Sequence, residues 1–496
     1  MAVPKSLAWI YQESGIAAVY TTGRDAWLLI LSRTIRMFAF GAVSLTIALF
    51  FSELGFSDFR IGLFLTLTLL GDVVLGTLIA LMADSIGRRR VLLAGGILMA
   101  VSGLVFMYFE NFWVLLIAAV VGVVSASGSD FGPFRAIEES MLSHITTPQT
   151  RPYVLSWYIT GSALGSAAGT QTAGQFVEAL KSKGMVQIYH ATFGIYVITG
   201  FMNMVLAFLM SSKCETERQD LVPEHVDELA QGLLEDSDSD DERVGLDTTM
   251  NTRRTPVAQQ PPSSSNWTSK FAQISVPTRN TMYKLWFLLC IDTLADGMCN
   301  QTLTNYYLDR KFEIPKTTLG NIVSAGMILG TVGTLFAGPL AHHLGLLNTM
   351  VFTHLPSSIA VALFPAPSSL AITVILLIVR MGLNPVDQAP RSAFIAAAVK
   401  PEERTAVMGI TSTLRTLAMA VGPSLTGMLA GSNKFWIAFV VGGMLRIMYD
   451  LGLYAIFVNV ELHAHETAKD TPTRVSLDDE EEAVEMQSHP RWNEGR

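Results

Sequence analysis

The sequence predicts an all-α membrane protein with about twelve transmembrane helices in two pseudo-symmetric halves of six. Half of the 496 residues are hydrophobic, only 15% are charged and the mean hydropathy is +0.39, whereas soluble domains carry about 25% charged residues. Apolar runs of about 20 residues, the length that crosses a bilayer, also recur along the chain. The predicted spans are 27–51, 58–82, 91–109, 113–134, 153–177, 190–211, 283–305, 318–341, 347–366, 369–390, 405–430 and 434–458.

Composition divides the chain into five parts. Residues 1–26 form an N-terminus without the apolar core of a cleaved signal, and 27–211 form the first half. Residues 212–282 are rich in Ser, Pro, Gln and acidic residues and predict a disordered linker; 283–458 form the second half, and 459–496 an acidic tail. The net charge of −8 comes largely from the linker and tail, so it argues against nucleic acid as a partner.

The two halves repeat one another. Gly169 and Gly422 are 253 residues apart, and Gly174 and Gly427 have the same spacing. Such an echo indicates a duplication of six spans. Parallel repeats of this kind place a substrate site near the middle of the membrane, between halves that rock around it.

The loop between the second and third spans is short and cationic. It contains Asp84, Gly87, Arg88, Arg89 and Arg90. A tight turn favours Gly87, and a cationic cluster at a membrane edge favours the cytoplasmic side. Because the number of spans between them is even, the N-terminus and the linker are expected on that side too.

With this loop, two six-span halves and a central linker, the chain resembles the major facilitator superfamily. The stretches Ser52–Asp58, Pro133–Ser140 and Asp387–Ala393 look like those of fungal members of largely unassigned substrate. The resemblance implies the major facilitator fold, a small-molecule substrate and a monomer in the lipid bilayer. It also implies that the loop latches the cytoplasmic face in the outward-open state, with Asp84 and Arg88 bridging helix ends and with Gly87, Arg89 and Arg90 in the same latch.

Four charges inside the spans are the main candidates for solute binding or proton coupling. An ionisable group at this depth costs about 2.5–3.5 kcal/mol, so it should face a cavity or a partner. Arg33 and Arg36 share one face of the first span, and Asp292 and Asp296 share one face of the seventh. We expect the four to face each other across a central cavity, with an aspartate as proton carrier. A permanent structural ion-pair network is the alternative, and Asn300 either extends this polar stripe or satisfies a broken helix.

Further charges are assigned structural or gating roles. Arg446 and Asp450, four residues apart, are expected to neutralise one another. Proton antiporters of the family usually carry an arginine in the fourth span, which is absent here. Arg380 in the tenth span is either its replacement or a relic of it. Interhelix gates are expected from Arg135, Glu138, Glu139 and Arg391.

Small residues in the fifth and eleventh spans predict close helix packing. Gly161, Gly165 and Gly169 recur at intervals of four, which lets a partner helix approach. The run is similar to a degraded form of the glycine motif of antiporters, while Gly422 and Pro423 stand together in the eleventh span. Ordinary helix packing is the competing interpretation of both.

The sequence contains no ATP-binding loop, and nothing in it resembles an enzyme. We expect a secondary active transporter that needs no cofactor and uses a proton gradient, exporting a small organic solute in exchange for protons. Proton-coupled uptake and a transport-dead receptor are the alternatives. The plasma membrane is expected ahead of the vacuole, although no motif separates them, and the solute is not specified. The cysteines Cys214, Cys290 and Cys299 are expected to be reduced bystanders.

Overall fold

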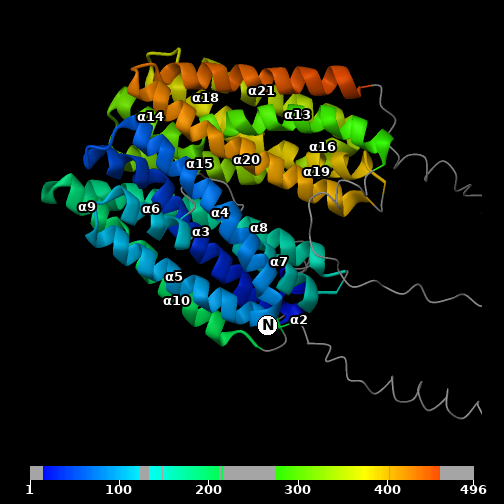
Figure 1. Cartoon of the computed structure of the whole chain (residues 1–496), viewed down its shortest axis with the longest axis horizontal. Coiled ribbons are helices and arrows are strands. Elements are labelled where there is room, and N and C mark those ends of the chain that lie inside the picture. Colours follow the sequence, from blue (N-terminus) through cyan, green and yellow to red (C-terminus); the bar gives the residue numbers. More distant parts are fainter. Residues whose placement is uncertain are drawn as a thin grey trace, which may run out of the picture.

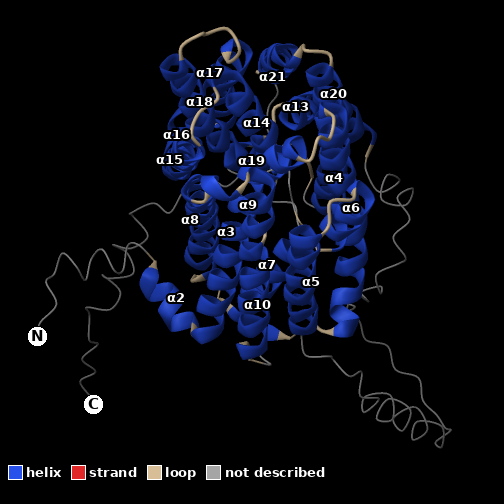
Figure 2. Cartoon of the chain, turned by 90° about the vertical axis from the view of Figure 1, so that its left-hand side faces the viewer, coloured by secondary structure: helices blue, strands red, loops and turns tan. Residues whose placement is uncertain are grey.

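The computed structural model describes residues 15–122, 124, 133–147, 149–211, 214–215, 275–400 and 403–458, and its regular elements there are all helices (Figures 1 and 2). The N-terminal half contains α2 (Ile16–Thr22), α3 (Arg24–Glu53), α4 (Asp58–Ile86), α5 (Arg88–Tyr108), α6 (Phe112–Val121), α7 (Pro133–Ile145), α8 (Arg151–Ala179), η1 (Lys181–Lys183), α9 (Met185–Thr192) and α10 (Gly194–Leu209). The C-terminal half contains α13 (Val276–Met298), α14 (Gln301–Phe312), α15 (Lys316–Leu335), α16 (Ala337–Leu344), α17 (Leu346–Leu363), α18 (Leu370–Leu383), η3 (Asn384–Asp387), α19 (Gln388–Ala397), α20 (Arg404–Gly431) and α21 (Phe435–Phe457).

The helices follow the predicted spans, and the fourth, seventh and tenth extend beyond their predicted ends, to Ile145, Phe312 and Ala397. The fourth span does not end near 134, because α7 continues it to Ile145. The seventh begins at Val276, so residues assigned to the linker are the first turns of α13. Most of the predicted linker and tail lies outside the described residues.

Eight helices or consecutive helix pairs in the described residues are long and apolar enough to cross a membrane on length and composition alone. The single helices α8 and α20 do not reach that standard, because Gly, Ser and Thr interrupt their apolar sequence. These small residues are the ones that bring helices close together, as the contacts below show.

The turns after α4 and α16 are equivalent in the two halves, and both depend on glycine. Gly87 has φ 103° and Gly345 has φ 85°, values that strain residues with a Cβ atom. Each amide caps the preceding helix by donating to a carbonyl four residues earlier, from Ala83 and Ala341 respectively. The predicted repeat is thus visible in the backbone.

The molecule has two distinct ends. We call the end with residues 54–57, 180–184, 313–315 and 432–434 the outer end, and the end with 86–88, 145–147, 149–151, 209–211 and 397–400 the linker end. The helices α7 and α19 reach the linker end, on the right of Figure 1. Aromatic rings fill the outer part of the N-terminal half, where the centroids of Phe51 and Phe64 are 4.5 Å apart.

Glycine contacts join the halves near the outer end at two equivalent places. A Cβ atom added to Gly174 on α8 would lie 2.5 Å from the carbonyl oxygen of Lys316 on α15, and one added to Gly427 on α20 would lie 2.5 Å from that of Asp58 on α4. We call these two contacts the glycine seam. Because only glycine permits such an approach, the halves are in backbone contact there.

Polar contacts reinforce the glycine seam. The Arg310 guanidinium in the C-terminal half lies 2.6 Å from the Asp58 carboxylate in the N-terminal half, and the Tyr306 hydroxyl donates to the same carboxylate at 2.7 Å. Further from the outer end, the side-chain amide of Asn305 donates a hydrogen bond to the backbone carbonyl of Ser44 in the other half. The protein is therefore closed at its outer end.

Candidate functional site

In the N-terminal half, the candidate arginines lie beside a buried glutamate. Arg36 Nη2 is 2.6 Å from Oε1 of Glu138 on α7, and the hydroxyl of Tyr158 on α8 donates to Oε2 at 2.7 Å. The Glu138 side chain is fully buried. Arg33 lies with its guanidinium carbon 5.5 Å from the centre of the Tyr158 ring. Arg36 is thus neutralised by Glu138 within its own half.

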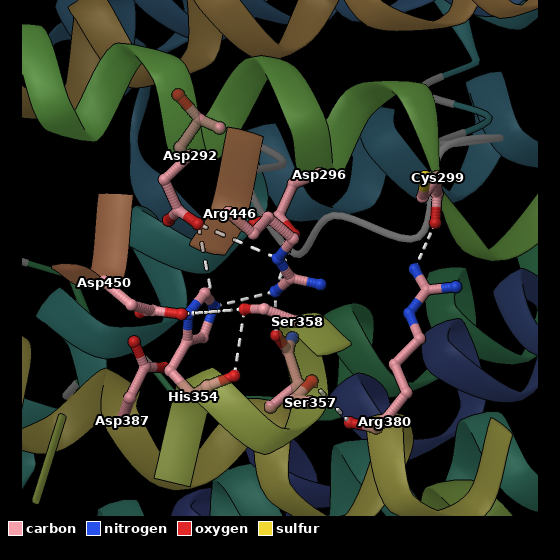
Figure 3. A network of polar contacts seen from close by, with 12 residues as sticks. Asp292, Asp296, Cys299, His354, Ser357, Ser358, Arg380, Asp387, Arg446 and Asp450 are labelled. Carbon is pink, nitrogen blue, oxygen red and sulfur yellow. Dashed lines mark hydrogen bonds and ion pairs between the residues drawn. The ribbon is translucent and has the colours of Figure 1, made fainter. Parts of the chain in front are cut away.

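In the C-terminal half, Asp292 is the centre of a buried charge network (Figure 3). Its Oδ2 lies 3.0 Å from Nη1 of Arg391 on α19. Its Oδ1 lies 3.6 Å from Nε2 of His354 on α17 and 3.8 Å from Nε of Arg446 on α21. Asp292 therefore holds four helices together and is itself completely buried.

Arg446 extends this network towards Asp296. Its Nη2 lies 3.1 Å from Oδ1 of Asp296, one turn after Asp292 on α13, and also donates to the Asn384 side chain in η3. Asp450 instead pairs with His354, whose Nδ1 is 2.7 Å from Oδ1 of Asp450. The prediction that Arg446 and Asp450 neutralise one another is wrong, because helices α13 and α17 supply a closer partner to each.

The charged contacts of the two halves are equivalent, with the signs exchanged. Glu138 and Arg391 are 253 residues apart, the spacing of the glycine pairs, and Arg36 and Asp292 have the spacing of Gly41 and Gly297. Those two glycines occupy matching places, since each packs on a backbone carbonyl of its own half, from Ser166 and Met419. One half therefore pairs arginine on the first span with glutamate, and the other pairs aspartate on the seventh with arginine.

The expected apposition of four charges across a central cavity needs correction. The ion pairs of Arg36, Asp292 and Asp296 lie within single halves. Helical spacing predicts which residues share a face of one helix. It does not predict which other helix packs against that face, because that depends on segments far away in the sequence.

Asn300 satisfies a broken helix. The seventh span breaks between α13 and α14, and the Asn300 side chain caps α14 by accepting a hydrogen bond from the Leu303 amide at 2.8 Å. Arg380 on α18 also contacts this break. It donates hydrogen bonds to the Cys299 carbonyl and, at 2.8 Å, to the Thr304 hydroxyl. Breaks inside a membrane persist only where protein groups satisfy the freed backbone in this way.

A cavity of about 320 Å³ lies between the halves, on the linker side of the glycine seam. It takes Met37 and Phe40 from α3, Ser162 and Ser166 from α8, and further residues from the C-terminal half. Its lining does not include Arg33, Arg36, Asp292 or Asp296. The C-terminal lining is Gln301, Met327, Gly330, Thr331, Thr334, Arg380, Met381, Asn384, Pro385 and Gln388.

The candidate packing glycines lie inside the halves. Gly161 and Gly165 pack on Thr34 of α3, and Gly169 packs on the carbonyl of Phe38. Gly422 meets the backbone of α13, whereas the carbonyl of the following Pro423 faces Gly62 of α4 in the other half. The contact between halves in the fifth span is made further along, by Gly174.

The cationic loop contacts the N-terminal half and a residue at the start of the predicted linker. The amides of Arg88 and Arg89 donate to the carboxylate of Glu215, at 2.9 and 3.2 Å, and Arg90 donates to the Ile86 carbonyl. The Asp84 side chain lies outside the described residues, and the latch role stays a prediction. Nearby, burial raises the pKa of the Cys214 thiol to about 12, and all three cysteines are free.

Two residues of this region were not singled out from the sequence. A histidine in the middle of an apolar span is unusual, so the sequence could have indicated His354. Its role in the network depends on its contacts with Asp292 of α13 and with Arg446 and Asp450 of α21. Asn384 joins the cavity to Arg446, a position that no local pattern indicates.

Comparisons with known proteins agree with this architecture. The family model of the Major Facilitator Superfamily matches residues 29–271 and 285–486. The chain therefore belongs to this superfamily of membrane transporters, and it is not an enzyme. Among individual proteins it is similar to the uncharacterized membrane protein YJR124C of Saccharomyces cerevisiae, with 31% identity over 444 residues that cover 88% of this chain and 95% of the yeast protein.

Solved structures share the fold at low identity. The nucleoside transporter NupG matches with a TM-score of 0.62 and 12% identity, over 88% of this chain and all of NupG. The xylose transporter XylE from E. coli, in an inward open conformation, matches with a TM-score of 0.61 and 11% identity, over 90% of this chain and 99% of XylE. At these identities the likeness concerns the fold.

Proposed function

We propose that the protein is a secondary active carrier that exports a small organic solute in exchange for protons, by alternating access. The observation that carries the proposal is the cavity between the halves, which lies beside a buried charge network and is sealed at the outer end by the glycine seam. With the linker end in the cytoplasm, as the cationic loop favours, this is the state that accepts solute from inside the cell.

The charge network supports proton coupling. Four carboxylates, from Asp292, Asp296, Asp387 and Asp450, form ion pairs with the guanidinium groups of Arg391 and Arg446 and with His354. Clusters of interacting titratable groups inside a membrane are typical of proton-binding sites, which supports proton coupling here.

Asp296 is the better candidate for the proton carrier. Its side chain is 25% exposed and its ion pair is with Arg446, whereas the Asp292 side chain is 0% exposed and shared among three cationic or titratable groups. A carrier must meet water in one state and lose it in another, which suits the partly exposed carboxylate. Asp292 is then the fixed structural member.

Asn384 provides a route from the solute to this proton site. It lines the cavity and accepts a hydrogen bond from Arg446, which in turn pairs with Asp296. A solute that displaces Asn384 changes how Arg446 is shared between Asn384 and Asp296. Solute binding and proton binding are thereby linked through one guanidinium group.

Transport in proteoliposomes tests this function. A comparison of metabolites in cells with and without the chain identifies candidate solutes, and purified protein is then reconstituted with solute inside the vesicles and an internal pH dye. Under an imposed pH gradient we expect solute to leave while protons enter. Solute and protons that move in the same direction would favour proton-coupled uptake, and solute binding without flux under any gradient would favour a receptor.

A further inference from the structure

Arg380 places a positive charge at the inter-half cavity. It lies on α18, lines the cavity and reaches the break in the seventh span. Its hydrogen bonds go to the Cys299 carbonyl (Figure 3) and to the Thr304 hydroxyl, and both acceptors are neutral. These contacts satisfy two donors of the guanidinium but leave its net charge without a carboxylate.

Three of the neighbouring arginines differ from Arg380 in this respect. Arg36, Arg391 and Arg446 each lie within 4.0 Å of a carboxylate. For Arg380 no carboxylate of the described residues lies within that distance. A cation at membrane depth is expensive unless it is paired or faces a cavity. The cavity is therefore where a counter-charge for Arg380 can be supplied.

The rest of the cavity lining favours the same kind of occupant. Within the described residues the lining contains no Asp, Glu, Lys or His beside Arg380. Amides and hydroxyls such as Gln301, Asn384 and Ser162 can accompany a polar group, and Met37, Phe40 and Met327 offer an apolar surface. Because the lining contains no carboxylate, an organic cation would find no ion-pair partner there, whereas an anion can pair with Arg380.

On the basis of the proposed function, we infer that the transported solute is a small amphipathic organic anion whose carboxylate, phosphate or sulfonate group binds Arg380. Its apolar part rests on the methionine and phenylalanine side chains of the other half. The cavity, at about 320 Å³, is at the small end of ligand pockets, which span roughly 300–1,000 Å³. It suits a single small molecule rather than a two-chain lipid.

Charged thiol reagents test the cavity without knowledge of the solute. In full-length protein with the native cysteines changed to alanine, Thr334→Cys places a reporter in the exposed part of the lining. We compare its reaction rates with a sulfonated and with a trimethylammonium methanethiosulfonate, each normalised to a free thiol. The sulfonated reagent should react faster by about tenfold, since a charged cleft raises local counter-ion concentration at least that much.

Variants of Arg380 identify the source of the effect. Arg380→Gln should abolish the preference for the sulfonated reagent, and Arg380→Lys should retain it. Thr147→Cys, exposed at the linker end and outside the lining, is the control reporter and should show no change with Arg380→Gln. Equal rates, faster reaction of the cationic reagent, or a preference that survives in Arg380→Gln would each overturn the inference.

The metabolite comparison provides the second test. Compounds whose cellular level depends on this chain should carry an anionic group, and neutral or cationic compounds would overturn the inference while leaving the carrier intact. An anionic preference of the reporter together with an absence of flux would instead overturn the proposed function alone.

Discussion

At the scale of single residues, Asp292 and Asp296 occupy different environments although they stand one helical turn apart. Asp292 is enclosed by Arg391, Arg446 and His354, and Asp296 is partly exposed with Arg446 as its ion-pair partner. The removal of one member of a buried ion pair costs about 3–5 kcal/mol, because the remaining charge has no compensation. The same substitution should therefore have different effects at these two positions.

We predict that Asp296→Asn reduces proton-driven solute flux at least about tenfold and preserves folding, because the amide keeps the shape of the side chain but cannot exchange a proton. Asp292→Asn should lower the thermal stability of the purified protein, since Arg391 loses one of its two carboxylate partners and keeps only Asp387. Flux in proteoliposomes and thermal unfolding in detergent measure the two effects. Normal gradient-driven flux in Asp296→Asn would reject this residue as the proton carrier.

Glu138 and Glu139 are neighbours on α7 and make a matched comparison. Glu138 is buried with Arg36 and Tyr158, whereas Glu139 pairs with Arg135 on the same helix and is 37% exposed. We expect Glu138→Gln to destabilise the protein by about 3 kcal/mol or more. Glu139→Gln should change stability by at most about 0.5 kcal/mol, as is usual for exposed pairs four residues apart. Equal effects in thermal unfolding would contradict the assignment of Glu138 as the buried partner.

At the scale of helices, the contacts between α8 and α15 and between α20 and α4 depend on the absence of side chains. Gly427 faces the carbonyl of Asp58, so an added methyl group requires the two helices to move apart. Gly409 lies on the same helix as Gly427 but has no atom within 4 Å of an added Cβ. It therefore controls for the general effect of alanine on helix stability.

We predict that Gly427→Ala opens the outer end and that Gly409→Ala does not. Spin labels at Glu53 and Glu313, exposed residues of opposite halves near the outer end, report the separation by pulsed electron paramagnetic resonance. Gly427→Ala should add a population at longer distance. If Gly427→Ala has the same distance distribution as the unmodified protein, the backbone contact at Gly427 does not hold the outer end closed.

At the scale of the whole molecule, charged residues link the halves across the outer end. The carboxylate of Asp58 forms an ion pair with Arg310 and accepts a hydrogen bond from Tyr306, and both partners are in the opposite half. The ion pair is partly exposed, with Arg310 42% exposed, so its contribution is expected to be at most about 1 kcal/mol. That energy corresponds to a population shift of about fivefold between closed and open states.

We predict that Arg310→Gln raises the open population at the outer end by up to about fivefold in the same distance measurement. High salt should produce part of this effect in the unmodified protein, because it screens exposed pairs. Lys181→Gln is the matched control: Lys181 pairs with Oε1 of Glu178 in its own half, while Oε2 accepts from the Lys316 amide of the other half, so the loss of Lys181 leaves the halves joined. A Lys181→Gln shift as large as that of Arg310→Gln would show that the ion pair has no specific role.

Sequence reasoning located the charged residues better than it located their partners. Helical spacing placed Asp292 with Asp296 on one face of α13, and both contact Arg446. It also gave a break at Asn300 as one of two alternatives. The same spacing failed for Arg446 and Asp450, where residues four apart contact different helices. Spacing defines a face within one helix and carries no information about which distant helix covers it.

By itself, the sequence determined that this protein spans a membrane through two repeated sets of helices, because span length, apolar composition and the repeat spacing are properties of contiguous segments. Only the tertiary structure decided that Arg36 pairs with Glu138, that Asp292 pairs with Arg391, and that Arg380 lines the cavity between the halves. Buried charges choose partners by the geometry of helices far apart in the chain, and that geometry exists only after the halves have packed.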